Sequence, residues 1–102
     1  MSNMKIEKFI ASWREHPGAI QMFTEGKCFW FAAILAEAFP GGVICYDAIV
    51  GHFYYFFKEK YWDIRGAHTD VKAYSWPSVI EKDWPWAKRI MRDCIFFEEV
   101  QE

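Results

Sequence analysis

The sequence predicts an α+β domain: N-terminal helices, one of them central and buried, pack on a small antiparallel sheet, and a C-terminal helix follows. Residues 4–15 repeat apolar side chains at helical spacing, and residues 28–39 are apolar on nearly every side. Residues 43–64 hold short segments rich in β-branched and aromatic residues. A chain of 102 residues that is 53% hydrophobic supports one core, so we expect residues 1–102 to form one domain.

Two helices are predicted in the first half of the chain. The first covers residues 4–15 and ends at the turn-forming residues 16–18. Its inner side is formed by Ile6, Phe9, Ile10 and Trp13. The second covers residues 28–39, carries Glu37 as its one charge and ends at residues 40–42, Pro-Gly-Gly. A helix that is apolar on all sides is usually buried on most of them, so this helix is expected to be central.

The predicted strands are residues 43–46, 52–57 and 61–64. Between the last two, residues 58–60 have the length of a hairpin loop. With a three-residue loop, paired residue numbers sum to 118, and His52 and Asp63 face opposite sides of the sheet. A two-residue turn or a bulge gives 117 or 115 and returns them to a shared face. The sequence leaves the choice between these registers open.

The last third of the chain is predicted to be loop followed by helix. Residues 65–82 resemble a loop by composition, because they include Gly66, Pro77 and several polar side chains. Asp83 is placed to cap a final helix that has Pro85 in its first turn. Its inner side is predicted to hold Trp86, Ile90 and Cys94. Residues 96–102 are expected either to add an edge strand or to fray.

Charge and cysteine content exclude several classes of function. With 12 basic and 14 acidic residues, the chain has no excess of positive charge for phosphates, so direct nucleic-acid binding is not expected. No apolar run approaches the roughly 20 residues of a membrane span, and the N-terminus does not resemble a signal peptide. Three irregularly spaced cysteines suit reduced thiols in a cytoplasmic protein and lack the paired spacing of a zinc site.

Three residues are candidates for thiol chemistry because of the elements on which they fall. Cys28 begins the buried helix, where the partial positive charge and free N–H groups stabilise a thiolate and a developing oxyanion. His52 begins a strand, and the chemistry needs a base of this type, because an ordinary imidazole titrates near neutral pH. Asp63 on the next strand can orient the imidazole. This order predicts a nucleophile, a base and an orienting acid, with no cofactor and no metal.

Plainer roles exist for each of these residues. Cys28 could be an inert packing residue and His52 an ordinary buried histidine, while Asp63 could cap the hairpin or pair with Arg65. His68 is a rival for the base, ranked lower because a loop holds its geometry less well than a strand. A metal site is disfavoured because nothing fixes the geometry of its possible ligands, which are His52, Asp63, His68 and Asp70. Cys45 and Cys94 are expected to be packing residues.

The aromatic content predicts a surface as well as a core. The 21 aromatic rings are difficult to bury completely in a chain of this size, so some are expected to line a groove or a partner surface. The run at residues 53–57 is most simply sheet core. Trp76, Trp84 and Trp86 are the candidates for a wall of a substrate cleft or an anchor for a protein partner.

The segment GKCFWFAAILAEAFPGG and the later GHFYYFFKEKYWDIRG, together residues 26–66, resemble the core of papain-like and transglutaminase-like cysteine enzymes. In those families a Gly-x-Cys opens a helix, a histidine opens a strand and an aspartate follows on the adjoining strand. The resemblance implies hydrolysis or acyl transfer on an amide or thioester, with a protein or peptide as substrate. It also implies a second oxyanion donor, for which Gln21 is the candidate. The 24- and 11-residue spacings are short, and papain's second subdomain has no counterpart.

The Gly-x-Cys-aromatic-Trp-Phe-Ala opening is also similar to that of short uncharacterised proteins of bacterial and phage genomes. This similarity implies an alternative function: a catalytically inert binding protein, such as a phage-encoded inhibitor of a bacterial defence (anti-CRISPR type) or of a host protein. In both interpretations the expected location is the cytoplasm of a bacterial or phage-infected host cell. The two differ in whether Cys28 is far more reactive than Cys45 and Cys94.

Overall fold

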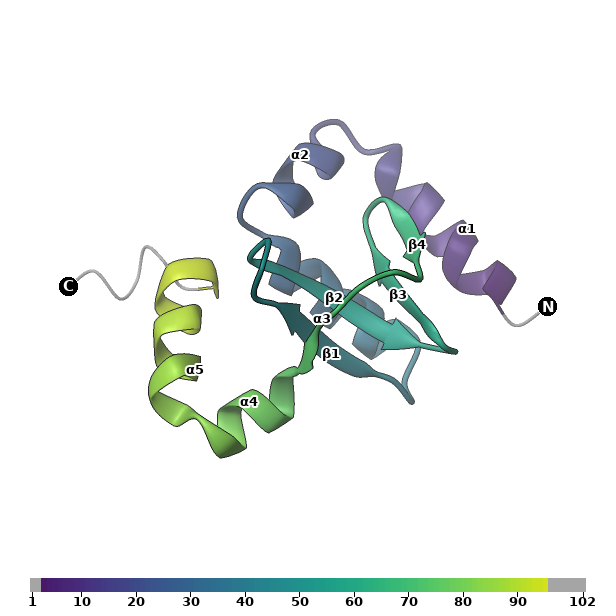
Figure 1. The fold of residues 1–102 in the computed structure, drawn as a ribbon. Coiled ribbons are helices and arrows are strands. Elements are labelled where there is room, and N and C mark those ends of the chain that lie inside the picture. The colour runs from purple at the N-terminus through teal and green to yellow at the C-terminus, as the bar shows by residue number, and fades with distance from the viewer. Residues whose placement is uncertain (1–2, 96–102) are drawn as a thin grey trace.

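A five-stranded antiparallel sheet in the order β4-β3-β2-β1-β5 organises the computed structural model, which describes residues 3–95 (Figure 1). Its strands are β1 (Val43–Asp47), β2 (His52–Phe57), β3 (Lys60–Asp63), β4 (Gly66–His68) and β5 (Tyr74–Ser75). The helices are α1 (Asn3–Arg14), α2 (Ala19–Thr24), α3 (Cys28–Ala38), α4 (Trp76–Lys82) and α5 (Trp84–Ile90), and α5 continues into a π-helical turn, η1 (Met91–Ile95). The predicted α+β class is confirmed.

Helix α3 is central, as its composition predicted, and packs against β2. The Phe29 ring meets the Phe53 ring edge-on at 5.1 Å, and Phe31 and Leu35 are fully buried in the same core. The predicted inner side of α1 joins this core through Ile6, with Phe9 partly buried at its margin. Within the part of the chain that the structure describes, no helix has the length and apolarity to cross a membrane.

The hairpin between β2 and β3 corrects the predicted three-residue loop. Phe57 pairs with Lys60, so the turn contains only Lys58 and Glu59 and paired residue numbers sum to 117. Both turn residues have positive φ, 53° and 67°, which is the backbone of a type I′ turn. This turn type matches the right-handed twist of the flanking strands, which explains why the shorter connection forms. In this register His52 and Asp63 lie on the same face.

Residues 65–82 are not mostly loop, contrary to the prediction from their composition. Strand β4 follows β3 through a tight turn, β5 adds two residues beside β1, and α4 begins immediately after β5. Ser75 caps α4, since its Oγ accepts a hydrogen bond from the Ser78 N–H at 3.4 Å. Pro77 lies in the first turn of α4, where its missing N–H costs nothing, so it marks the start of a helix rather than a loop.

The C-terminal helix forms where the sequence predicted it. The Asp83 carboxylate accepts a hydrogen bond from the Trp86 N–H at 3.2 Å and caps α5. Ile90 is buried, and Trp86 and Cys94 are partly buried against the core. The alternatives proposed for residues 96–102 lie outside the described residues.

Candidate active site

Cys28 is the first residue of α3 and is held below the surface. The chain enters the helix through Gly26, whose φ of 128° favours glycine, and Lys27, whose carbonyl accepts the first helical hydrogen bonds. The Cys28 residue is 6% exposed. The backbone N–H groups of Phe53 on β2 and Phe29 on α3 act to lower the pKa of its thiol. A sulfur atom in this position therefore faces donors from two elements.

His52 connects the thiol to a carboxylate. It is the first residue of β2, and its Nε2 lies 2.9 Å from Oδ2 of Asp63 at the end of β3. The same imidazole lowers the pKa of the Cys28 thiol, and the thiol in turn raises the pKa of His52. The His52 and Asp63 side chains are 14% and 7% exposed. The structure thus brings together all three residues singled out for thiol chemistry.

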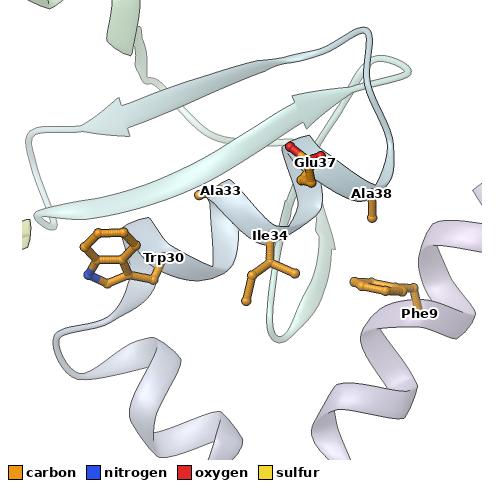
Figure 2. A pocket seen from close by; sticks show the side chains of 6 residues that line it. All are labelled: Phe9, Trp30, Ala33, Ile34, Glu37 and Ala38. Carbon is orange, nitrogen blue, oxygen red and sulfur yellow. The ribbon is translucent and has the colours of Figure 1, made fainter.

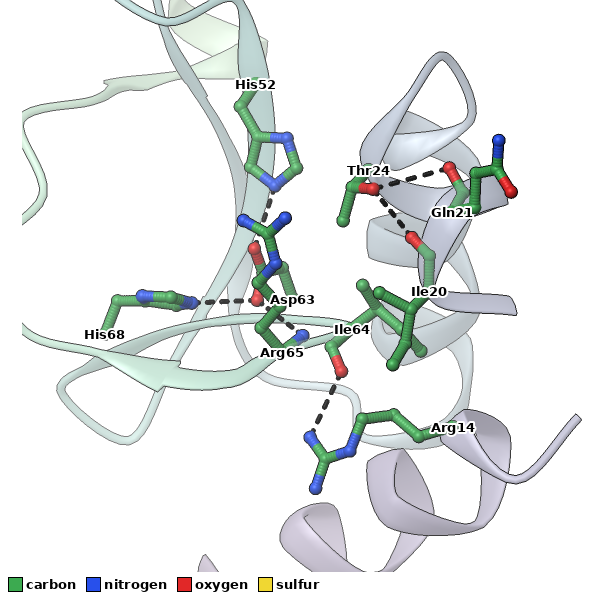
Figure 3. A network of polar contacts seen from close by, with 9 residues as sticks. All are labelled: Arg14, Ile20, Gln21, Thr24, His52, Asp63, Ile64, Arg65 and His68. Carbon is green, nitrogen blue, oxygen red and sulfur yellow. Dashed lines mark hydrogen bonds and ion pairs between the residues drawn. The ribbon is translucent and has the colours of Figure 1, made fainter. Parts of the chain in front are cut away.

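The Asp63 carboxylate has two further partners (Figure 3). Its Oδ1 accepts a hydrogen bond from the backbone N–H of Arg65 at 2.9 Å and lies 2.8 Å from Nε2 of His68. The Tyr54 ring lies edge-on to both imidazoles, with centroids 4.7 Å from His52 and 5.4 Å from His68. The carboxylate is therefore fixed by donors on both oxygens, and the two histidines share it.

The electrostatics of this arrangement favour a charged pair. Burial raises the pKa of the Cys28 thiol, but hydrogen bonding to His52 and to the Phe53 N–H outweighs burial and holds it below its ordinary value. Burial lowers the pKa of His52, but hydrogen bonds to Asp63 and Cys28 raise it to about 9. For Asp63, burial raises the pKa, and hydrogen bonds from His52 and His68 bring it below its usual range. These shifts favour transfer of the thiol proton to the imidazole.

A polar pocket of about 320 Å³ lies beside His52, between the end of α2 and the ends of β2, β3 and β4 (Figure 3). It is lined by Thr24, Glu25, Val50, His52, Tyr54, Asp63, Arg65 and His68. Its walls carry both a guanidinium and carboxylates. Cys28 is not among the residues that line this pocket.

The side chain of Gln21, the residue predicted as a second oxyanion donor, is directed at Glu25. It lies on the exposed side of α2, and its Nε2 donates a hydrogen bond to Oε1 of Glu25 at 3.3 Å. It does not line the polar pocket beside His52. The candidate donors are instead the backbone N–H groups of Phe53 on β2 and Phe29 at the start of α3, which act on the Cys28 thiol.

The three tryptophans proposed as a surface separate into different environments. Trp76 is 6% exposed and packs edge-on against Phe53 at 5.1 Å, so its proposed place on a partner surface is wrong. It is the first residue of α4, and burying it attaches this helix to the core. Trp86 is partly buried against Tyr46, while Trp84 is 49% exposed and remains available to a partner.

Sequence reasoning ranked His68 as a rival base and missed its contact with Asp63. The missing signal was the turn at Ile64 and Arg65, which returns the chain as β4 and places His68 opposite Tyr61. Tyr54, assigned only to the sheet core, lies between the two histidines. Among residues 3–95, no three His, Cys, Asp or Glu side chains are arranged to hold a metal ion.

A second pocket, of about 480 Å³ and almost entirely apolar, lies between α1 and α3 (Figure 2). It is lined by Phe9, Trp30, Ala33, Ile34, Glu37 and Ala38. None of Cys28, His52 and Asp63 lines it, whereas His52 and Asp63 line the polar pocket, which is therefore the candidate site.

A family model described as "Phage YunG-like protein" matches residues 6–91 of the chain. The match extends from α1 into the first residue of η1 and therefore includes Cys28, His52, Asp63 and His68. No curated protein and no solved structure matches the chain.

Proposed function

The chain belongs to the phage YunG-like protein family, and we propose that it is a cysteine-dependent hydrolase or acyltransferase acting on an amide or a thioester. The observation that carries this proposal is the 2.9 Å contact between His52 and Asp63, together with the lowering of the Cys28 thiol pKa by the same histidine. The cysteine begins a helix, and the histidine and aspartate lie on neighbouring strands. This order is similar to that of papain-like and transglutaminase-like enzymes, and we assign the site to that type.

The proposed reaction begins with proton transfer from the Cys28 thiol to Nδ1 of His52. The sulfur attacks the substrate carbonyl carbon, a C–S bond forms, and the carbonyl oxygen becomes negatively charged. Backbone N–H groups at the start of α3 stabilise this oxyanion. When the intermediate collapses, the bond to the leaving amine or thiol breaks, and the imidazolium of His52 gives its proton to that group. Asp63 orients the ring and stabilises its charged form.

The second half of the reaction releases the acyl group. A water molecule or an acceptor amine gives a proton to His52 and attacks the thioester carbon. The bond between this carbon and Sγ breaks, and the Cys28 thiol is restored with the proton held by His52. Water gives hydrolysis and an amine gives acyl transfer, so the acceptor that reaches the polar pocket distinguishes the two reactions.

Alkylation by iodoacetamide from pH 5 to 9, with mass-spectrometric assignment of each cysteine, tests the proposal. We expect Cys28 to react at pH 6 at least about tenfold faster than Cys94, because a pKa lower by one unit gives a tenfold larger thiolate fraction. His52→Ala is expected to remove this advantage. His16→Ala, in the exposed turn after α1, is the matched control and should leave it unchanged. A Cys28 rate no greater than that of an ordinary thiol would contradict the proposal.

A second candidate function is a catalytically inert binding protein, such as a phage-encoded inhibitor of a bacterial defence or host protein. It is supported by exposed apolar side chains: Ile49 and Val50 on the β1–β2 loop are 82% and 64% exposed, and Trp84 is 49% exposed. This function predicts that Cys28→Ala keeps the biological effect while Trp84→Ala removes it. Loss of the effect on Cys28→Ala, with the fold intact by circular dichroism, favours the enzyme.

A further inference from the structure

The Asp63 carboxylate contacts three hydrogen-bonding groups, although only one of them, His52, belongs to the proposed set of catalytic residues. Oδ2 lies 2.9 Å from Nε2 of His52, while Oδ1 has both the Arg65 N–H at 2.9 Å and Nε2 of His68 at 2.8 Å. The Asp63 side chain is 7% exposed, whereas that of His68 is 33% exposed. A second imidazole therefore contacts the carboxylate from the solvent side.

His68 is placed by backbone pairing rather than by a loose loop. It ends β4, and its cross-strand partner is Tyr61 on β3, two residues before Asp63. Its ring packs edge-on against Tyr54 at 5.4 Å, and Tyr54 packs in the same way against His52 at 4.7 Å. The two imidazoles are therefore arranged on either side of one carboxylate and one aromatic ring.

We propose that His68 is a positioning residue, which donates a hydrogen bond from Nε2 to Oδ1 of Asp63 and so keeps Oδ2 directed at His52. This inference rests on the proposed function and extends the site to four residues. A carboxylate attached to a strand end can rotate about its last side-chain torsion, which is broad and has few intrinsic preferences. Two donors on Oδ1 restrict that rotation, and the remaining oxygen stays opposite the imidazole that faces Cys28.

Supporting partners of this kind orient the groups that touch substrate, and their loss loosens the geometry without removing a reacting atom. The Arg65 N–H is a backbone donor and cannot follow the carboxylate if it rotates. His68 is a side-chain donor whose ring is itself held by Tyr54. The titratable and charged groups around His68 that the pocket and strand pairing bring near it are Asp63, Tyr54, Tyr61, Arg65 and, across the pocket, Glu25.

The test measures the titration of His52 directly. The chain contains three histidines, 16, 52 and 68, so each ring signal can be assigned by single substitution in the NMR spectrum of the whole protein. In the wild type, the pKa of His52 is expected at about 9. Asp63→Asn is expected to lower it by about 1 unit or more, and this shift is the reference for complete loss of the carboxylate.

Three substitutions of His68 separate its hydrogen bond from its packing. His68→Ala removes both, His68→Phe keeps a ring against Tyr54 without a donor, and His68→Gln keeps an N–H donor at a similar reach. We expect Ala and Phe each to lower the pKa of His52 by about 0.5 unit, in the direction of Asp63→Asn, and Gln to restore it. His16→Ala should have no effect. An unchanged or raised pKa in both Ala and Phe variants, or no recovery with Gln, would overturn the proposal.

The same samples separate this inference from the proposed function. Iodoacetamide alkylation of wild-type Cys28 reports whether the thiol is activated, and it does not depend on the His68 variants. If wild-type Cys28 reacts slowly, the proposed function fails, yet the His52 titration still decides whether His68 holds Asp63. If Cys28 is activated in the wild type and the His52 titration is the same with Ala, Phe and Gln at position 68, only the role of His68 is wrong.

Discussion

At the scale of single residues, the three cysteines show that burial alone does not set the pKa of a thiol. Burial raises the pKa of Cys45 to about 11 and also raises that of Cys94. Burial acts in the same direction on Cys28, but hydrogen bonding with His52 and the Phe53 N–H lowers its pKa overall. All three are free thiols. What distinguishes Cys28 is the set of donors around its sulfur, which supports its assignment as the nucleophile.

Asp63 gives a prediction about stability in acid. Although burial raises the pKa of this carboxyl, hydrogen bonds from His52 and His68 bring it below its usual range. A lowered folded-state pKa contributes stability above the unfolded-state value, near ~3.9, and that stability is lost as pH falls through the folded-state value. We expect the difference in unfolding free energy between wild type and Asp63→Asn to shrink between pH 5 and pH 2. Urea titrations at each pH measure it.

The exposed Asp70 supplies the control for this acid series. The difference between wild type and Asp70→Asn should stay nearly constant over the same pH range, because exposed charged groups contribute little to stability. A difference for Asp63→Asn that is equally constant would show that the two histidines do not stabilise its charged form.

At the scale of elements, the sequence predicted long or strongly patterned segments and missed short ones. The amphipathic α1 and the uniformly apolar α3 were predicted within a residue or two of their ends, because each contains enough residues to show a pattern. The three-residue β4 and two-residue β5 are too short to show alternation. They are strands because β3 and β1 offer them hydrogen bonds, which is a property of the assembled sheet.

Whether His52 and Asp63 could meet depended on the length of the turn between β2 and β3, which the sequence left open by one residue. The order of Cys28, His52 and Asp63 on helix and strands could be read from the sequence, but their contact could not. A three-residue loop would have placed His52 and Asp63 on opposite faces, and the observed turn at Lys58 and Glu59 places them on the same face. Because side chains alternate along a strand, a change of one residue in turn length decides whether the site exists.

The same turn gives a prediction about stability. Lys58 and Glu59 both have positive φ, which favours Asn and Gly over residues with long side chains. Replacing them by Lys58→Asn and Glu59→Gly is expected to stabilise the protein by about 1 kcal/mol, because the strained backbone is relieved without changing the register. Thermal and urea unfolding measure the change. Glu59→Ala keeps the unfavourable φ and should give no gain; a double variant no more stable than wild type would contradict the turn assignment.

A second element-scale prediction concerns the connection from α3 to β1. The buried Tyr55 hydroxyl donates a hydrogen bond to the Phe39 carbonyl and accepts one from the Gly42 N–H at 2.9 Å. Tyr55→Phe leaves both backbone groups without this partner and is expected to cost about 1–3 kcal/mol of unfolding free energy. Iodoacetamide reactivity of Cys28 should stay at the wild-type level. A large loss of Cys28 reactivity in a folded Tyr55→Phe protein would contradict a purely structural role.

At the scale of the whole molecule, the candidate site is a product of tertiary structure. Cys28 comes from α3, His52 from β2, Asp63 from β3 and His68 from β4, and the sheet must pack on α3 before the first two meet. In Figure 1 these elements lie together in the middle of the molecule, with α1 and α2 beside them and α4 and α5 at the other end. The activation of Cys28 is therefore expected to be lost when the sheet separates from α3.

Unfolding is accordingly expected to change the reactivities of two cysteines in opposite directions. At pH 6.5, denaturation returns Cys28 to an ordinary thiol pKa of about 8.5, so only about 1% is thiolate and its alkylation slows. Cys45 is buried with a pKa of about 11, so its alkylation speeds up when the sheet opens. Iodoacetamide labelling across a urea series, with each cysteine assigned by mass spectrometry, should show both changes at the midpoint measured by circular dichroism. Faster labelling of Cys28 on unfolding would mean that the folded protein only buries this thiol and does not activate it.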